Sequence, residues 1–148
     1  MTTDTSASLS TELDVLGALL AFDFIGFAQK SAALDPADPR YGQAVGAAFG
    51  VAVRRRFPEG GTPEGIGAYV AGFLGSLEAG AEDFDPVFLE RLFTTALGGG
   101  EVPGGEGPGP EATIQARLVL TLRLVRELGL GPDEQRELLA EAAVLATA

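Results

Sequence analysis

One carboxylate lies in the most apolar stretch of the sequence. Asp23 stands among leucine, phenylalanine and isoleucine side chains in the segment LLAFDFIGFAQK, residues 19–30. A carboxylate buried in such surroundings either takes up a proton more readily or requires a cation as partner. Because charged side chains are almost never buried unpaired, two interpretations remain open. Asp23 either lies at a rim, where it meets water or caps a helix, or it pairs with a cation, for which Arg56 is the candidate.

Three consecutive arginines, Arg54, Arg55 and Arg56, end a predicted helix in the segment RRRF. Cations complement the dipole at the C-terminal end of a helix, and this alone explains their position. The cluster also stands out in a chain of net charge −11, so it could instead bind an anion or an acidic partner. On a helical wheel, Arg56 shares the face of the apolar stripe, whereas the other two arginines face away. All three are candidate binding residues.

Aromatic side chains provide a second candidate site. Phe24 and Phe27 lie in the first predicted helix, and Tyr69 and Phe73 lie in the third. Ligand pockets are lined mainly by such side chains, with a few polar groups that orient the ligand. These four residues could line an apolar pocket in which Asp23 or Arg56 is the polar handle.

Histidine and cysteine are both absent from the sequence. Their absence removes the commonest general base, the commonest transition-metal ligand and all thiolate chemistry. A metal would have to be a hard ion with oxygen ligands, and no spacing of acidic residues matches such a site. The glycine-rich segments do not match a phosphate-binding motif. We therefore predict a non-catalytic protein with no cofactor and no metal.

The net charge of −11 also restricts the partners. An acidic surface repels phosphate backbones and anionic headgroups, so we expect neither a nucleic-acid nor a membrane partner. No apolar stretch approaches the roughly 20 residues of a membrane-spanning helix, and the segment MTTDTSASLS does not resemble a signal peptide. We expect a cytoplasmic protein. The preference for arginine over lysine, with abundant alanine and glycine, is typical of bacteria with GC-rich genomes.

The elements that must position these residues are predicted to be helical. Several segments begin with a capping residue followed by proline, which is a helix-start signal. No segment shows the sustained alternation that is typical of strands. The sequence predicts an all-α, orthogonal or bundle-like single domain of about six helices. The predicted helices span residues 11–33, 40–57, 63–79, 86–97, 111–128 and 132–146.

Two of these helices have unusual faces. The helix over residues 11–33 is apolar on nearly every side, which is typical of a central, buried helix. The helix over residues 63–79 has a face of small residues, and glycine inside a helix costs ~1 kcal/mol relative to alanine. Close intramolecular packing, a dimer face or a ligand slot could offset that cost. The small residues in question are Gly65, Ala68, Ala71, Gly72 and Gly75, together with Gly46 and Gly50 of the preceding helix.

Composition predicts the domain organisation. We expect a disordered N-terminus over residues 1–10, a four-helix core over residues 11–97 and a C-terminal helical hairpin over residues 111–148. Between core and hairpin, the segment GGGEVPGGEGPGP, residues 98–110, is typical of a flexible linker. A hairpin of this size cannot bury its apolar faces alone. It must dock on the core, either in cis or in a domain-swapped dimer.

These features favour one class of function. An acidic helical domain without catalytic motifs is typical of a protein–protein interaction or self-assembly module, which could serve regulation and could form a homodimer. The alternative is a protein that binds or sequesters a small apolar ligand in the phenylalanine-lined pocket described above.

Overall fold

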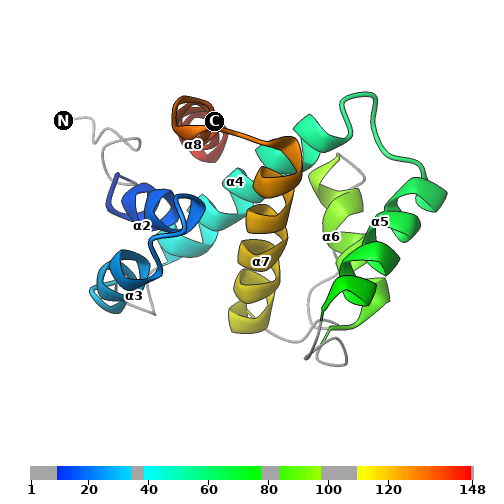
Figure 1. Cartoon of the computed structure of the whole chain (residues 1–148), viewed down its shortest axis with the longest axis horizontal. Coiled ribbons are helices and arrows are strands. Elements are labelled where there is room, and N and C mark those ends of the chain that lie inside the picture. Colours follow the sequence, from blue (N-terminus) through cyan, green and yellow to red (C-terminus); the bar gives the residue numbers. More distant parts are fainter. Residues whose placement is uncertain (1–9, 35–38, 78–83, 98–109, 148) are drawn as a thin grey trace.

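A computed structural model describes residues 10–34, 39–77, 84–97 and 110–147 (Figure 1). The described residues are helical and contain no strand, so the all-α prediction is confirmed. The predicted disordered N-terminus and flexible linker lie outside the described residues, except that Ser10 and Pro110 begin helices. The described helices are α2 (Ser10–Leu20), α3 (Phe24–Ala32), α4 (Pro39–Arg56), α5 (Pro63–Ser76), α6 (Pro86–Ala96), α7 (Pro110–Leu128) and α8 (Pro132–Thr147).

Proline and capping residues set where most of these helices begin. All five helices from α4 to α8 start at a proline, which loses no hydrogen bond at the first helical position. The Thr62 hydroxyl accepts a hydrogen bond from the Gly65 N–H, and the Asp85 carboxylate accepts one from the Val87 N–H. These caps satisfy backbone donors that have no partner inside the helix. Apart from the first helix, the predicted bounds agree with the observed ones to within three residues.

The first predicted helix is wrong as a single element, because it is broken between α2 and α3. Phe22 adopts a left-handed backbone conformation, with φ 61°, and the Asp23 side chain caps α3 by accepting a hydrogen bond from the Gly26 N–H at 3.0 Å. A Cβ at position 26 would lie 2.3 Å from Asp23 Oδ2, so this cap depends on glycine. The seven helices of the described chain therefore exceed the predicted six by one.

The two halves of that segment also differ in burial. Val15, Leu16 and Leu20 of α2 are fully buried, as predicted for a core helix. In contrast, α3 has no buried residue and packs mainly on α2. The interpretation of residues 11–33 as one central helix therefore holds only for α2.

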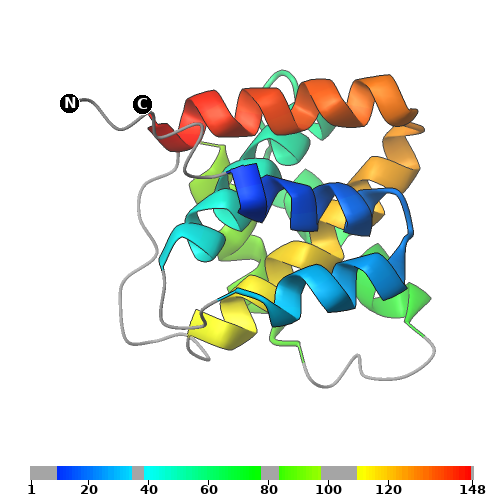
Figure 2. The ribbon, with the colours of Figure 1, turned by 90° about the vertical axis from the view of Figure 1, so that its left-hand side faces the viewer.

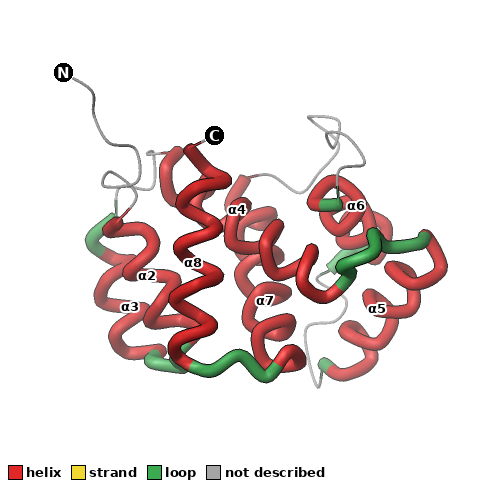
Figure 3. The backbone as a smooth tube through the Cα atoms, turned by 90° about the horizontal axis from the view of Figure 1, so that it is seen from above, coloured by secondary structure: helices red, strands yellow, loops and turns green. Residues whose placement is uncertain are grey.

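The central helix of the fold is α4. It contacts α2, α6, α7 and α8 (Figures 1 and 3), and most of its residues from Ala44 to Val53 are buried. Its glycines admit close neighbours, because a Cβ at Gly46 would lie 3.4 Å from Arg117 Nη1 and one at Gly50 would lie 3.7 Å from Leu145. The glycines of α4 thus serve packing against α7 and α8 within the chain.

The small residues of α5 differ from the glycines of α4 in how closely they are packed. Apart from the adjoining residues and backbone of α5 itself, no described heavy atom lies within 4 Å of a Cβ built at Gly72 or Gly75, and both glycines are exposed. Ala68 and Ala71 are exposed as well. The small-residue face of α5 is therefore not packed against the described part of the chain.

An aromatic cluster joins α5 and α6 to the central helix. The Phe93 ring of α6 lies 5.5 Å from Phe49, 6.0 Å from Phe57 and 5.2 Å from Tyr69, measured between ring centroids. Such ring pairs contribute ~0.5–1.5 kcal/mol each beyond their burial. The cluster places Phe57 and Tyr69 beneath the end of α4, where Arg56 lies.

No helix in the described ranges combines the length and the apolar character needed to cross a membrane.

Candidate functional site

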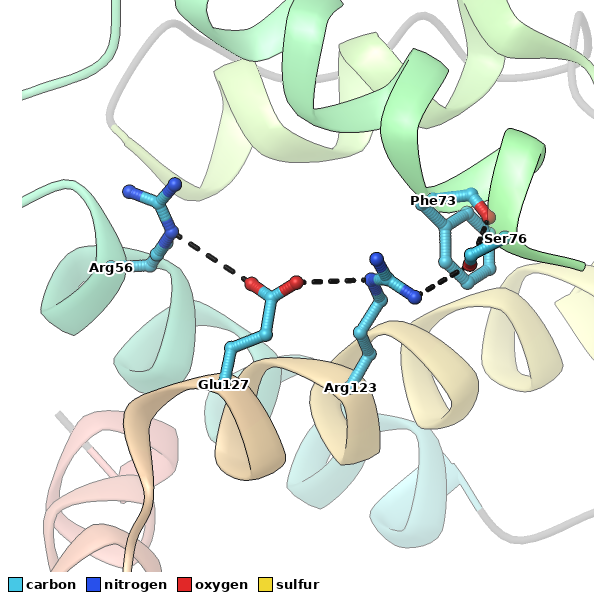
Figure 4. A network of polar contacts seen from close by, with 5 residues as sticks. All are labelled: Arg56, Phe73, Ser76, Arg123 and Glu127. Carbon is cyan, nitrogen blue, oxygen red and sulfur yellow. Dashed lines mark hydrogen bonds and ion pairs between the residues drawn. The ribbon is translucent and has the colours of Figure 1, made fainter.

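A chain of polar contacts connects the ends of three helices (Figure 4). On α7, Glu127 places Oε1 3.2 Å from Arg123 Nε and Oε2 3.9 Å from Nε of Arg56, the last residue of α4. Arg123 also donates a hydrogen bond of 2.6 Å to the Ser76 hydroxyl at the end of α5. That hydroxyl in turn donates to the Phe73 carbonyl oxygen at 2.7 Å. One carboxylate therefore lies between two arginines.

Aromatic rings lie under both arginines. The guanidinium carbon of Arg56 is 5.0 Å from the centroid of the Phe57 ring and 5.4 Å from that of Tyr69. The guanidinium carbon of Arg123 is 5.6 Å from the centroid of Phe73. A cation over an aromatic face is attracted by the ring quadrupole, with ~0.5–1 kcal/mol at exposed sites. These rings hold the arginines in place without neutralising their charge.

Tyr69 contributes a buried hydroxyl below this network. The residue is 9% exposed, and its hydroxyl has no hydrogen-bond partner among the described residues. Burial is the main cause that raises the pKa of Tyr69 above its ordinary value; the nearby Glu127 carboxylate raises it further, and Arg123 opposes the shift. Tyr69 therefore stays neutral at physiological pH.

A cleft of about 500 Å³ separates α5 from α7 next to the network. Its lining combines apolar and charged side chains. Arg123 and Arg126 contribute two positive charges at the cleft and Glu127 one negative charge, and Arg126 has no ion pair with any described residue. The apolar lining residues are Phe73, Leu77, Val119 and Leu122. The cleft is thus a locally basic, partly apolar surface on a protein of net charge −11.

Exposed apolar side chains lie beside the cleft, at the turn between α2 and α3. Phe22, Phe24 and Ile25 are 45%, 54% and 76% exposed. The rings of Phe22 and Phe24 meet edge to face at 6.0 Å. The guanidinium carbon of Arg126 lies 5.8 Å from the Phe22 ring centroid, so this arginine belongs to both features. We call residues 22–25 the aromatic turn.

The structure brings together only part of the predicted site. Arg56, Tyr69 and Phe73 meet at the network and the cleft. Asp23 and Phe24 belong to the aromatic turn, and Phe27 is half-buried on α3, so these three do not complete a pocket with Tyr69 and Phe73.

The three consecutive arginines point to different partners. Arg56 reaches Glu127, whereas Arg55 forms an ion pair of 2.9 Å with Glu141 of α8. Arg54 is exposed and lines a second groove, of about 430 Å³, between α4 and α8. The hypothesis of an Asp23–Arg56 pair is wrong, because Asp23 is an exposed cap and the carboxylate near Arg56 is that of Glu127.

Sequence reasoning missed the residues that α7 supplies. Arg123, Arg126 and Glu127 are three and four residues apart, which places them on one face of a helix. That spacing was a usable signal, but it does not reveal that α5 lies opposite. Ser76 has no distinguishing pattern around it.

No protein-family model, curated protein or solved structure matches this chain. Among the described residues, no three acidic side chains gather closely enough to hold a metal ion. The function therefore has to be argued from the geometry of the cleft and its neighbours.

Proposed function

We propose that this protein is a non-catalytic protein-interaction module that binds an acidic, partly apolar segment of a partner in the α5–α7 cleft. One observation carries the proposal. Arg123 and Arg126 line the cleft together with apolar side chains that form its floor, and among the described residues the one carboxylate in its lining, Glu127, pairs with Arg123 and Arg56. An acidic segment with large apolar side chains complements both the charge and the floor.

The polar chemistry of the site supports binding over reaction. The Ser76 hydroxyl accepts a hydrogen bond from a guanidinium and donates one to a backbone carbonyl. Neither the Arg123 guanidinium nor the Phe73 carbonyl takes up a proton at physiological pH, so neither activates the Ser76 hydroxyl as a nucleophile. Arginine, in contrast, is well suited to carboxylate recognition, because its planar group offers several donors in a fixed geometry.

The shape of the cleft favours a peptide over a small apolar ligand. A pocket for a small ligand encloses most of the ligand surface, and the pocket predicted from sequence included Phe24 and Phe27 among its lining residues. Both residues lie on α3, and neither lines the cleft.

A displayed library of short random peptides tests the proposal. The wild-type protein should enrich peptides that combine Asp or Glu with Phe, Leu or Ile. Synthetic copies of these peptides should bind the Arg123→Gln/Arg126→Gln variant about tenfold more weakly, and added salt should weaken wild-type binding.

A matched control variant changes the net charge by the same amount as Arg123→Gln/Arg126→Gln does. The Arg54→Gln/Arg136→Gln variant loses two exposed arginines that do not line the cleft, and it should bind the peptides as the wild type does. Binders that respond equally to both variants would overturn the proposal.

A further inference from the structure

The aromatic turn exposes its apolar side chains to water in a strained backbone conformation that costs free energy. Phe22 has φ 61°, a conformation that bulky L-residues rarely adopt and that costs free energy. Strained backbone persists where the surrounding structure or function requires it. Here the strain presents two aromatic rings and Ile25, which is 76% exposed, beside a cap that fixes their direction.

The aromatic turn also carries a negative charge. Asp23 lies between the two phenylalanines, and its Oδ1 caps α3 through the Gly26 N–H. Its second oxygen has no hydrogen-bond partner among the described residues. The segment Phe-Asp-Phe-Ile is therefore an apolar, acidic projection, which is the chemistry that complements the cleft.

Projection and cleft lie next to each other. Arg126 lines the cleft and lies 5.8 Å from the Phe22 ring. The turn between α2 and α3 and the C-terminal end of α7 lie at the same edge of the molecule (Figures 2 and 3). A surface that carries a projection and a matching cleft side by side is self-complementary about a twofold axis, as an isologous dimer requires.

We propose that a second copy of this chain occupies the cleft. The aromatic turn of each protomer enters the α5–α7 cleft of the other, where Asp23 faces the partner's Arg126 and the phenylalanine rings cover the apolar floor. This inference rests on the proposed function, because it names the acidic, apolar segment that the cleft binds. Each protomer contributes a segment to the other's cleft, so the cleft is complete only in the dimer.

Exchange of the two charges tests this pairing. Asp23→Arg and Arg126→Asp each place like charges opposite each other in a homodimer, so each variant alone should sediment as a monomer. In an equimolar mixture, both contacts join opposite charges again, and the heterodimer should form. Sedimentation equilibrium measures the mass of each sample, and circular dichroism confirms that both variants are folded. Wild-type protein that is monomeric at high concentration, homodimers of either variant, or a mixture that stays monomeric would overturn the inference.

A pair of exposed apolar residues supplies the matched control. Ile25→Asp changes the aromatic turn, whereas Val87→Asp changes a 56% exposed residue on α6 that lies outside both turn and cleft. We expect Ile25→Asp to weaken dimerisation by at least about tenfold and Val87→Asp to leave it unchanged; equal effects would contradict the inference.

The Ile25→Asp variant also distinguishes a failure of this inference from a failure of the proposed function. Ile25→Asp leaves the cleft residues intact and, as a monomer, leaves the cleft open to the displayed peptides. Peptide binding by a wild-type protein that never dimerises would overturn the dimer but retain the interaction module. Failure of the Ile25→Asp protein to select any peptide would overturn the interaction module itself.

Discussion

The guanidinium carbon of Arg126 lies 5.8 Å from the centre of the Phe22 ring. This contact joins α7 to the turn that ends α2, two elements that are separated by more than 100 residues of sequence. It brings an exposed aromatic projection next to a basic cleft, and both the proposed interaction surface and the proposed dimer depend on that adjacency.

Replacement of Phe22 by glycine should change stability much less than the loss of a core aromatic ring. Glycine adopts positive φ freely, so Phe22→Gly removes a strain of about 1–2 kcal/mol, against which the greater freedom of glycine in the unfolded chain costs about 0.5–1 kcal/mol. Urea denaturation in the Ile25→Asp background avoids any contribution from association. The lost ring contacts with Phe24 and the Arg126 guanidinium act in the opposite direction, so we expect the free energy of unfolding to change by no more than about 2 kcal/mol.

The buried Phe93 provides the comparison for that experiment. Its ring contacts three other aromatic rings, so Phe93→Ala should lower the free energy of unfolding by about 3–5 kcal/mol. A loss of similar size for Phe22→Gly would show that the Phe22 ring supports the fold and is not a projection held at a cost.

Neutralisation of Glu127 should strengthen peptide binding. Glu127→Gln removes the only carboxylate of the described network and leaves Arg56 and Arg123 free to attract an acidic peptide. Because these ion pairs are about a third exposed, stability should fall by less than ~1 kcal/mol. Fluorescence anisotropy of a labelled acidic peptide should show a several-fold lower dissociation constant.

Glu141 is the matched control for that substitution. It lies on α8, outside the cleft, and pairs with Arg55 of α4, so Glu141→Gln changes the net charge equally without changing the site. Equal gains in affinity from both variants would indicate a general charge effect and contradict a role for Glu127 in the cleft.

Alkaline pH should destabilise the protein through Tyr69. Burial raises the pKa of Tyr69 in the folded protein above the unfolded value of about 10. Above that pH the unfolded chain loses a proton that the folded chain keeps, so the free energy of unfolding falls as pH rises toward the folded pKa. Tyr69→Phe should make this fall shallower, as measured by urea denaturation between about pH 7 and pH 11.

At neutral pH the same substitution should cost little. The Tyr69 hydroxyl has no hydrogen-bond partner among the described residues, and phenylalanine keeps the ring contacts with Phe57 and Phe93. Tyr41→Phe is the control, because burial alone raises the pKa of Tyr41. We expect Tyr41→Phe to reduce the fall of the free energy of unfolding at alkaline pH by less than Tyr69→Phe does. A large loss of stability for Tyr69→Phe at pH 7 would reveal a hydrogen bond of the hydroxyl.

Alanine at position 72 should stabilise the helix that carries it. A Cβ at Gly72 meets no described atom within 4 Å, so Gly72→Ala should raise the free energy of unfolding by about 1 kcal/mol. Gly61→Ala should have the opposite effect, because its Cβ would lie 2.9 Å from Ile66 and 3.0 Å from Leu97. Thermal unfolding of both variants makes the comparison, and a lower midpoint for Gly72→Ala would show that its face contacts another surface.

Local sequence predicted most of the helix boundaries. Proline and capping residues act within a few residues of a helix start, so Thr62-Pro63 and Asp85-Pro86 could be recognised without a structure. The break at residues 21–23 was not recognised. The apolar pattern continues through it, and the competing signal is a single cap in which Asp23 accepts the N–H of Gly26.

The candidate site could be predicted only in part. Arg56, Tyr69 and Phe73 were identified by residue type, and the structure places them at one site. The Asp23–Arg56 pair failed because a helical wheel gives the face of one helix and not the neighbour that this face meets. The carboxylate near Arg56 comes from α7, more than 70 residues away in the chain.

By itself, the sequence determined that this chain is helical, where most of its helices begin, and that it lacks histidine and thiol chemistry. These properties depend on residue type and on neighbours within one or two turns. The tertiary structure alone decided that α4 is central, that Arg123 and Arg126 face α5 across a cleft, and that Phe22 lies beside Arg126. Such relationships arise from the packing of distant segments, in which many residues act together, and no local pattern encodes them.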